Sequence, residues 1–136
     1  MPYLLDTCIV SYFFRKEEGV LKKIESLDPD ELKISSITFM EIEYGLALNP
    51  AIERKIGRLW KSFTEQIEML EFNTHDAKLT ANLRKHLKEA GTPIGAYDLL
   101  LAGTALSRKL TFVTDNIKEF ARVPKLNVEN WCLARA

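Results

Sequence analysis

Tyr3-Leu4-Leu5-Asp6-Thr7 is a short apolar run that ends abruptly in two polar residues. Such a run predicts a buried strand whose carboxyl end opens onto a polar surface. The apolar segment that follows, residues 8–14, is too long to continue the same strand, so we expect a helix there. A buried strand followed at once by a helix is how a fold of alternating strands and helices begins.

The same alternation continues along the chain. Further strands are expected at residues 32–35, 67–72, 110–113 and 128–131. Further helices are expected at residues 20–27, 38–48, 50–66, 76–90, 98–108 and 117–120. Strands that alternate with helices favour a parallel sheet covered on both faces. We therefore predict an α/β fold with a single domain over residues 1–136, without repeats, linkers or low-complexity segments.

Composition excludes several classes of protein. The 19 Lys and Arg residues balance the 19 Asp and Glu residues, which excludes an acidic disordered segment and a strongly basic nucleic-acid coat protein. A nuclease stays possible, because a basic face and an acidic pocket cancel in the sum. Two distant cysteines, Cys8 and Cys132, make neither a disulfide framework nor a metal knuckle. With no leader-like start and no apolar run near the ~20 residues of a membrane span, we expect a soluble cytoplasmic protein.

Four acidic residues occupy the positions where parallel sheets bind ligands. Asp6 follows the first expected strand and Asp115 the fourth, while Glu41 and Asp98 lie near the starts of apolar helices. Ligands bind at the carboxyl ends of parallel strands, so these acids are expected at one edge of the sheet. Converging carboxylates repel unless cations neutralise them, and oxygen ligands select Mg²⁺ or Mn²⁺. Such a site polarises a phosphoryl oxygen and activates water, which is the chemistry of phosphodiester hydrolysis.

Each of these acids also has an ordinary structural interpretation. Asp6 would cap the helix that follows it, and Glu41 would close a capping box with Thr38. Asp98 would complement the dipole of its helix, and Asp115 would belong to a turn. Taken singly, every acid is ambiguous. Their joint placement at one edge of the predicted sheet favours a site.

Four motifs carry a resemblance to a known family. They are Leu4-Leu5-Asp6-Thr7, then Ile37-Thr38-Phe39-Met40-Glu41-Ile42-Glu43-Tyr44-Gly45, then Pro93-Ile94-Gly95-Ala96-Tyr97-Asp98-Leu99-Leu100-Leu101-Ala102, and finally Phe112-Val113-Thr114-Asp115-Asn116 followed by Glu119-Phe120. With these motifs the chain strongly resembles the PIN-domain ribonucleases, specifically the VapC toxins of bacterial toxin–antitoxin pairs. The resemblance spans nearly the whole chain, and four motifs in this order and spacing make it specific.

The resemblance implies a fold and an activity. It implies a three-layer α/β/α fold with a central parallel sheet of four to five strands, and an endoribonuclease that needs Mg²⁺ or Mn²⁺. It also implies an RNA substrate, in some relatives tRNA, and a VapB-type antitoxin partner. A homodimer is expected, with a VapB peptide blocking a groove that the two sites share. Residues 52–63 and 76–87 offer apolar positions beyond what one small sheet needs, and we expect them in the dimer interface.

The resemblance also assigns site residues by position. The matching residues are the acids Asp6, Glu41 and Asp98, a fourth acid from Asp115 or Glu119, and the supporting residues Thr7, Thr114 and Asn116. Many relatives carry Asn where this chain has Asp115 or Asn116, and an acid at the position of Glu119. We rank Asp115 first as the fourth acid, because it directly follows the fourth strand, and Glu119 second.

Three other classes are weaker interpretations. A receiver-like Mg²⁺-binding signalling domain needs adjacent acids after its first strand, where this chain has only Asp6. A phosphatase of the haloacid dehalogenase type needs a second Asp at the position of Cys8. A catalytically silent PIN scaffold is disfavoured because Asp6, Glu41 and Asp98 are all present.

Overall fold

The computed structural model describes residues 2–133. Its strands are β1 (Tyr3–Leu5), β2 (Leu32–Ser35), β3 (Glu68–Leu70), β4 (Thr111–Val113) and β5 (Val128–Glu129). Its helices are α1 (Thr7–Phe14), α2 (Glu18–Ser26), α3 (Ser36–Leu48), α4 (Pro50–Gln66), α5 (Thr74–Glu89), α6 (Ala96–Arg108) and α7 (Ile117–Phe120), with the 3₁₀ helix η1 (Pro29–Glu31). Within the described residues, no helix combines the length and the apolar character that a bilayer span requires.

The strands form one parallel sheet in the order β3-β2-β1-β4-β5, which confirms the predicted α/β class. The bounds of the helices differ from prediction mainly at their starts. Helix α5 begins at Thr74 because Asn73 and Asp76 form a reciprocal capping box there. Helix α6 begins at Ala96, after Gly95, two residues before the predicted start. Strands β3, β4 and β5 are each shorter than predicted.

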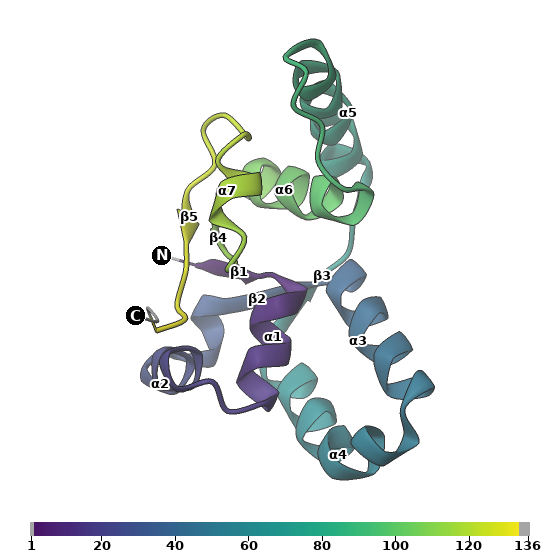
Figure 1. The fold of residues 1–136 in the computed structure, drawn as a ribbon, viewed down its shortest axis with the longest axis vertical. Coiled ribbons are helices and arrows are strands. Elements are labelled where there is room, and N and C mark those ends of the chain that lie inside the picture. The colour runs from purple at the N-terminus through teal and green to yellow at the C-terminus, as the bar shows by residue number, and fades with distance from the viewer. Residues whose placement is uncertain (1, 134–136) are drawn as a thin grey trace.

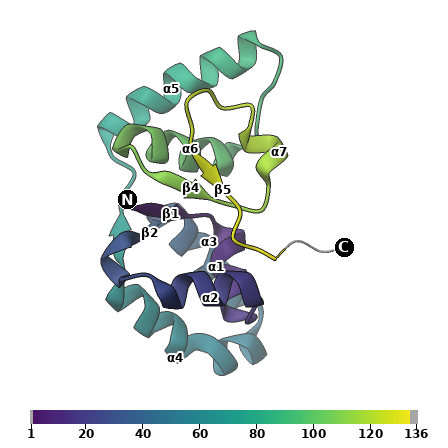
Figure 2. The ribbon, with the colours of Figure 1, turned by 90° about the vertical axis from the view of Figure 1, so that its left-hand side faces the viewer.

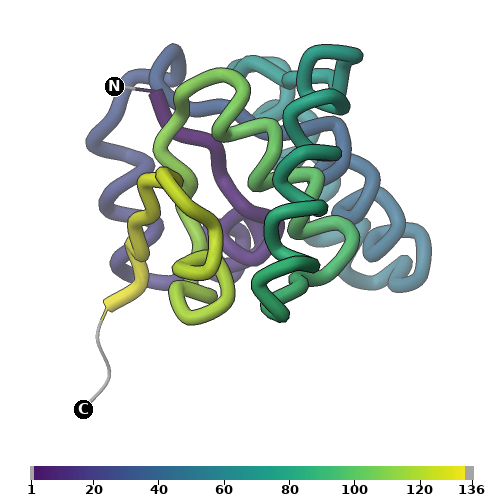
Figure 3. The backbone as a smooth tube through the Cα atoms, turned by 90° about the horizontal axis from the view of Figure 1, so that it is seen from above, coloured from purple at the N-terminus to yellow at the C-terminus, as the bar shows by residue number. Residues whose placement is uncertain are grey.

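Helices cover both faces of the sheet, so the predicted three layers are present (Figure 1). Helices α1, α2 and α4 lie on one side, and α5, α6 and α7 on the other (Figure 2). Figure 3 looks down on the α5–α7 layer and shows the other helices behind it. Successive side chains of a strand point to opposite faces, and accordingly Leu5 belongs to the first apolar cluster while Leu4 belongs to the second.

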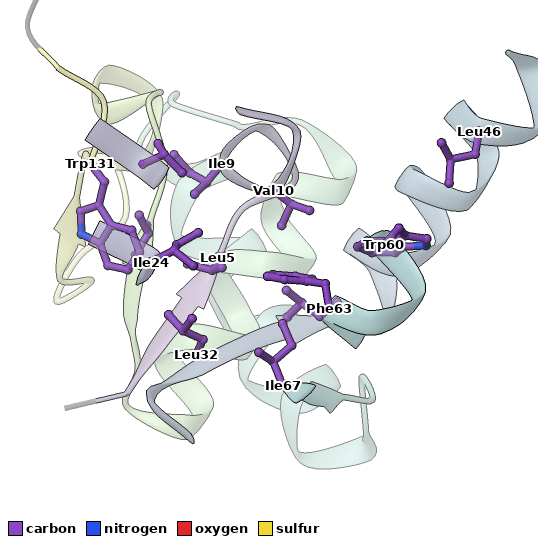
Figure 4. Close-up of a cluster of buried hydrophobic side chains, with 13 residues drawn as sticks. Leu5, Ile9, Val10, Ile24, Leu32, Leu46, Trp60, Phe63, Ile67 and Trp131 are labelled. Atoms are coloured by element: carbon purple, nitrogen blue, oxygen red, sulfur yellow. The ribbon is translucent and has the colours of Figure 1, made fainter. Parts of the chain in front are cut away.

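The core on the α1–α4 side is rich in aromatic residues. Leu5, Val10, Trp60 and Phe63 meet there beside Ile67 (Figure 4). Trp60 stacks on Phe63 with ring centroids 6.1 Å apart. The exposed fractions of Trp60 and Phe63 are only 3% and 8%, so these apolar positions of α4 belong to the core of the protein itself.

On the other side, α5 and α6 pack closely. A Cβ atom added at Gly103 of α6 would overlap the hydroxyl of Thr80 on α5 and lie 2.8 Å from its Cβ. The Arg108 guanidinium at the end of α6 reaches back to Asp76 of α5, with Nη2 2.9 Å from Oδ2. The apolar residues Leu83 and Leu87 of α5 are buried against the sheet. Glycine therefore permits the close approach of the two helices, and an ion pair joins their ends.

The strand order creates the place where a site can form. The chain builds β1, β2 and β3 outward in one direction, then returns to add β4 and β5 on the other side of β1. Leu5 pairs with Val113, and the amide of Asp6 donates to the carbonyl of Val113 at 2.9 Å. The residues after β1 and β4 are therefore direct neighbours at the carboxyl edge, at the point where the strand order reverses.

Candidate active site

Asp6 directly follows β1 and is almost fully buried. It caps α1, since its Oδ1 accepts from the amide of Thr7 at 2.7 Å. Its Oδ2 accepts from the hydroxyl of Thr114 at 2.7 Å. Burial raises the pKa of Asp6, and these hydrogen bonds only partly offset that effect. The capping role expected from the sequence is thus present, and one carboxylate oxygen still turns across the sheet edge toward β4.

Glu41 approaches the same place from α3. Its Oε1 accepts from the Thr7 hydroxyl at 2.8 Å. The capping box expected between Thr38 and Glu41 is wrong, because α3 begins at Ser36 and the side chain of Ser35 caps it. Thr38 instead lies inside the helix, with its hydroxyl 3.0 Å from that of Thr7. Glu41 is therefore free of a capping role and contacts the residue that follows Asp6.

Asp98, in the first turn of α6, is the most perturbed of these acids. Its pKa is raised to about 7, first by burial and then by a hydrogen-bonding contact with Glu119. The negative charges of Glu119, Asp6 and Glu41 raise it further. The four carboxylates thus lie close enough together to oppose one another's ionisation. We call Asp6, Glu41, Asp98 and Glu119 the acidic cluster.

Glu119 is held in the acidic cluster from two sides. Its Oε1 accepts from the amide of Gly95 at 3.1 Å, and its Oε2 accepts from the side-chain amide of Asn116 at 2.6 Å. A Cβ atom at Gly95 would lie 3.0 Å from Oδ2 of Asp98, which is tight. A glycine before α6 therefore gives the Asp98 carboxylate room, while the glycine amide binds Glu119 at the same helix start.

Asp115 does not join the acidic cluster. Its side chain is exposed and turns toward α1, where Tyr12 Oη donates to Oδ2 at 2.6 Å. The Cys8 thiol lies 3.2 Å from Oδ1 of Asp115 and 3.4 Å from Oδ2 of Asp6. The Asp115 carboxylate raises the pKa of Tyr12 to about 12. The pKa of Cys8 lies well above its ordinary value, first because of burial and then because of the Asp6 charge, so the thiol keeps its proton.

The donor set of the acidic cluster fits a hard divalent cation. Its ligand atoms are all carboxylate oxygens, which Mg²⁺ and Mn²⁺ prefer. Across residues 2–133, no three His, Cys, Asp or Glu side chains stand in an arrangement that could hold a metal ion without moving. Mg²⁺ takes one or two carboxylates directly and fills its other positions with water, so it does not require three preformed side-chain ligands.

A groove of about 750 Å³ opens beside the acidic cluster. Thr7 and Glu41 line one end of it, and it continues between α1, α3 and α4. Its walls include apolar side chains together with the cationic residues Arg15, Lys16 and Lys55. Glu41 is the member of the acidic cluster that lines this groove, so an elongated ligand lying in it would reach the cluster at Glu41.

A family model and full-length relatives agree with this geometry. The model of the PIN domain matches residues 3–126. This chain belongs to the PIN-domain family, in its VapC branch. It is 35% identical over 132 residues to the tRNA(fMet)-specific endonuclease VapC of Salmonella typhimurium, covering 97% of this chain and 99% of the relative. It is also 35% identical over 133 residues to Ribonuclease VapC2 of Rickettsia felis, covering 96% and 98%.

Solved structures of VapC proteins with their partners have the same fold as this PIN domain. The DNA-bound VapBC of Salmonella typhimurium superposes with a TM-score of 0.88 at 35% identity, covering 97% of this chain and 99% of that one. VapBC2 of Rickettsia felis, bound to a promoter DNA fragment, gives a TM-score of 0.86 at 34% identity, with 96% and 99% covered. The expected α/β/α PIN fold is therefore confirmed.

Sequence reasoning missed three contributors to the site of this PIN domain. Gly95 makes room for Asp98 and donates its amide to Glu119. Tyr12 and Cys8, one helical turn apart in α1, both contact Asp115. The spacing of Cys8 and Tyr12 could have predicted that they act together, because side chains four residues apart share one face of a helix.

Proposed function

We propose that this PIN domain, spanning residues 1–136, is the toxin of a type II toxin–antitoxin pair. It acts as an endoribonuclease that requires Mg²⁺ or Mn²⁺. The observation that carries the proposal is the meeting of carboxylates at one sheet edge, where Thr7 joins Glu41 to the residue after Asp6, and Asp98 and Glu119 both approach Gly95. The raised pKa of Asp98 agrees with this placement, and no ion pair of the described residues neutralises these acids. The names of the VapC relatives, an endonuclease and a ribonuclease, support the same activity.

Asp6, Glu41, Asp98 and Glu119 are the residues that would hold the cation. Mg²⁺ or Mn²⁺, when bound, supplies charge that polarises a phosphoryl oxygen and lowers the pKa of a coordinated water. Glu119 is the stronger candidate for the fourth acid, because it contacts Asp98 whereas Asp115 turns toward α1. This reverses the ranking drawn from the sequence.

The neutral residues of the site orient the carboxylates. Thr114 donates to Oδ2 of Asp6 and fixes its position. Thr7, the residue after Asp6, donates to Glu41 and so links α3 to the end of β1. Asn116 holds Glu119 from within the same loop. Such partners keep ligand oxygens aimed at one position and limit the reorganisation needed when a cation binds.

RNA is the proposed substrate, and the groove beside the acidic cluster supports it. Arg15, Lys16 and Lys55 offer three positive charges along this groove, suited to backbone phosphates. A tRNA is one candidate, since the VapC of Salmonella typhimurium is named for tRNA(fMet). We infer a cytoplasmic location, where RNA is present and a free thiol such as that of Cys8 is stable.

We infer two protein partners. The first is a VapB-type antitoxin, supported by the solved VapBC complexes of Salmonella typhimurium and Rickettsia felis. The second is another copy of the chain. Met40, Tyr44 and Leu48 form an exposed apolar stripe on α3, at i, i+4 and i+8, next to Glu41 of the acidic cluster. A symmetric dimer through this stripe would bring two sites close to each other.

An RNA cleavage assay with sequencing of the new 5′ ends tests the proposed function. Wild-type protein with Mg²⁺ is expected to leave a 5′-phosphate and a 3′-hydroxyl, because water and not the 2′-hydroxyl attacks. Asp98→Asn should lose nearly all cleavage, whereas Asp30→Asn, at an exposed acid of η1, should cleave like the wild type. Full activity in excess EDTA, or in Asp98→Asn, would refute the proposal and leave a binding scaffold as the interpretation.

A further inference from the structure

The Asp115 carboxylate has both of its oxygens occupied by side chains of α1. Oδ2 accepts from the Tyr12 hydroxyl at 2.6 Å, and the Cys8 sulfur lies 3.2 Å from Oδ1. A phenol that donates to a carboxylate at this distance forms a charge-assisted hydrogen bond, which is among the stronger kinds in proteins. Asp115 is therefore restrained at the rim of the site even though its side chain is exposed.

The loop that follows β4 distributes its side chains in three directions. Thr114 donates to Asp6 in the acidic cluster, and Asn116 donates to Glu119, also in the cluster. Asp115, between them, is the one that turns outward to α1. The backbone around Asp115 is thus fixed next to the acidic cluster, and only the direction of its side chain keeps its carboxylate outside.

The Asp115 carboxylate lies near enough to Asp6 for the two charges to interact. The charge of Asp115 contributes to the raised pKa of Asp6, and the Cys8 sulfur lies within 3.4 Å of a carboxylate oxygen of each residue. The thiol has a single hydrogen, so it satisfies only one of the two carboxylates at a time. The Tyr12 hydroxyl donates its hydrogen to Asp115, whereas the Cys8 thiol is shared between Asp115 and Asp6. Tyr12 is therefore the firmer restraint.

We propose that Tyr12, assisted by Cys8, is a positioning residue that holds Asp115 against α1 and keeps it out of the acidic cluster. This inference rests on the proposed metal site. Without the restraint, the Asp115 carboxylate would turn inward and add a fifth acid to the four. Mg²⁺ and Mn²⁺ then bind more tightly, but the added carboxylate takes a position that water needs. Tyr12 thereby favours a cation that is bound less tightly and that keeps a coordination position for water.

Binding of Mn²⁺ alone tests the proposal without an activity measurement. The free Mn²⁺ signal in electron paramagnetic resonance gives the dissociation constant for each variant. Tyr12→Phe, which keeps the ring and removes only the hydroxyl, is expected to bind Mn²⁺ roughly 10-fold more tightly than wild type, the scale on which outer-shell groups act. Cys8→Ala should change the constant in the same direction by a smaller factor. Tyr3→Phe, at a half-buried tyrosine at the start of β1, serves as the matched control and should bind like the wild type.

The double variant Tyr12→Phe/Asp115→Asn assigns the effect to Asp115. It is expected to bind Mn²⁺ like Asp115→Asn alone, because the restraint has nothing left to restrain. Thermal melting of each variant checks that α1 stays folded. Unchanged or weaker binding by folded Tyr12→Phe would overturn the positioning role while leaving the metal site intact. No Mn²⁺ binding by the wild type, or equal binding by Asp98→Asn, would instead refute the metal site and with it the proposed function.

Discussion

Neutral donors hold the carboxylates of the acidic cluster. Hydroxyl groups of Thr7 and Thr114, the amide of Gly95 and the side chain of Asn116 donate hydrogen bonds to three of its four acids, namely Glu41, Asp6 and Glu119. In the part of the chain that the structure describes, the ion pairs of Lys and Arg involve none of the four acids. The negative charge is thus oriented without being neutralised, which is what a site for a divalent cation requires.

The placement of Glu119 predicts a difference between two variants. Glu119→Gln should reduce RNA cleavage at saturating Mg²⁺ by roughly 100-fold, since it removes a charge that contacts Asp98. Asp115→Asn should reduce it by less than roughly 10-fold, since that carboxylate faces Tyr12. Rates from a labelled RNA under single-turnover conditions provide the comparison. A larger loss in Asp115→Asn would restore the ranking drawn from the sequence.

The raised pKa of Asp98 predicts a pH dependence of stability in EDTA. The native protein keeps this proton up to about pH 7, whereas the unfolded chain releases it near the ordinary value of 3.8. The native state thus holds more protons across this window, and its free energy of unfolding falls as the pH rises through it. Asp98→Asn cannot ionise, so between about pH 5 and about pH 8 its stability should improve relative to wild type. Urea unfolding of both proteins at each pH measures this, and a constant difference would contradict the assignment.

The chemistry of the site was more predictable from sequence than the directions of its side chains. Asp6, Glu41 and Asp98 follow from strand ends and helix starts, which the apolar pattern locates. The choice between Asp115 and Glu119 depends on which way a loop side chain turns. That direction is set by Tyr12, about a hundred residues away in sequence, and no local pattern records the contact.

At the scale of elements, the α5–α6 pair depends on one buried charge. Asp76 is fully buried, and Arg108 lies within 2.9 Å of it. Burial alone would raise the pKa of Asp76, but hydrogen bonds from Arg108 and from the amide of Asn73 more than offset this and lower it. The carboxylate therefore contributes stability above its ordinary pKa of 3.8, and that contribution is lost as the pH falls through its lower folded value.

Arg108→Met is the variant that tests this pair. It should lower the free energy of unfolding by about 3 kcal/mol at neutral pH, because it leaves a buried carboxylate without its partner. The loss should shrink in acid, where Asp76 takes up a proton. Lys22→Met, which breaks an exposed pair with Glu18, is the matched control and should leave the urea midpoint unchanged. Equal effects of the two substitutions would show that the buried pair carries no special weight.

The positions of helices were predictable from the sequence where a regular apolar pattern extends over many residues. The exact first and last residues of the elements were less predictable. The period places α4 and α6 well, since apolar faces run along most of each helix. The start of α3 was misplaced because Ser35, Ser36 and Thr38 are all good capping residues, and only the backbone shows that Ser35 is the one used. The need for glycine at position 103 could not be predicted from the local sequence, because it comes from the close approach of Thr80 on another helix.

At the scale of the whole molecule, the exposed apolar surface predicts the dimer interface. Residues 76–87, also expected in the interface, offer less exposed apolar surface, since Leu83 and Leu87 are buried within the protein. On α4, Ile52 and Leu59 stay exposed while the aromatic residues are buried. The stripe on α3 is more continuous, and Tyr44 at its centre is 64% exposed.

Tyr44→Lys places a charge in the middle of that stripe and should convert a dimer to a monomer. Light scattering at micromolar concentration measures the mass of both proteins. Lys125→Glu, an exposed charge change in the loop after α7, is the control and should stay dimeric. A wild-type monomer would refute the dimer, and a dimeric Tyr44→Lys protein would move the interface away from α3.

The pairing of β1 with β4 also governs when this protein can become active during its synthesis. Asp6 is among the first residues to leave the ribosome, yet its hydroxyl partner Thr114 follows 108 residues later. Until β4 emerges, β1 has no neighbour on that side, and Glu119 is not yet in place. Contacts so distant in sequence form late and slowly. Under the proposed function, a nascent chain still tethered to the ribosome therefore carries an incomplete nuclease, and the proposed antitoxin would have the opportunity to bind it before the site is assembled.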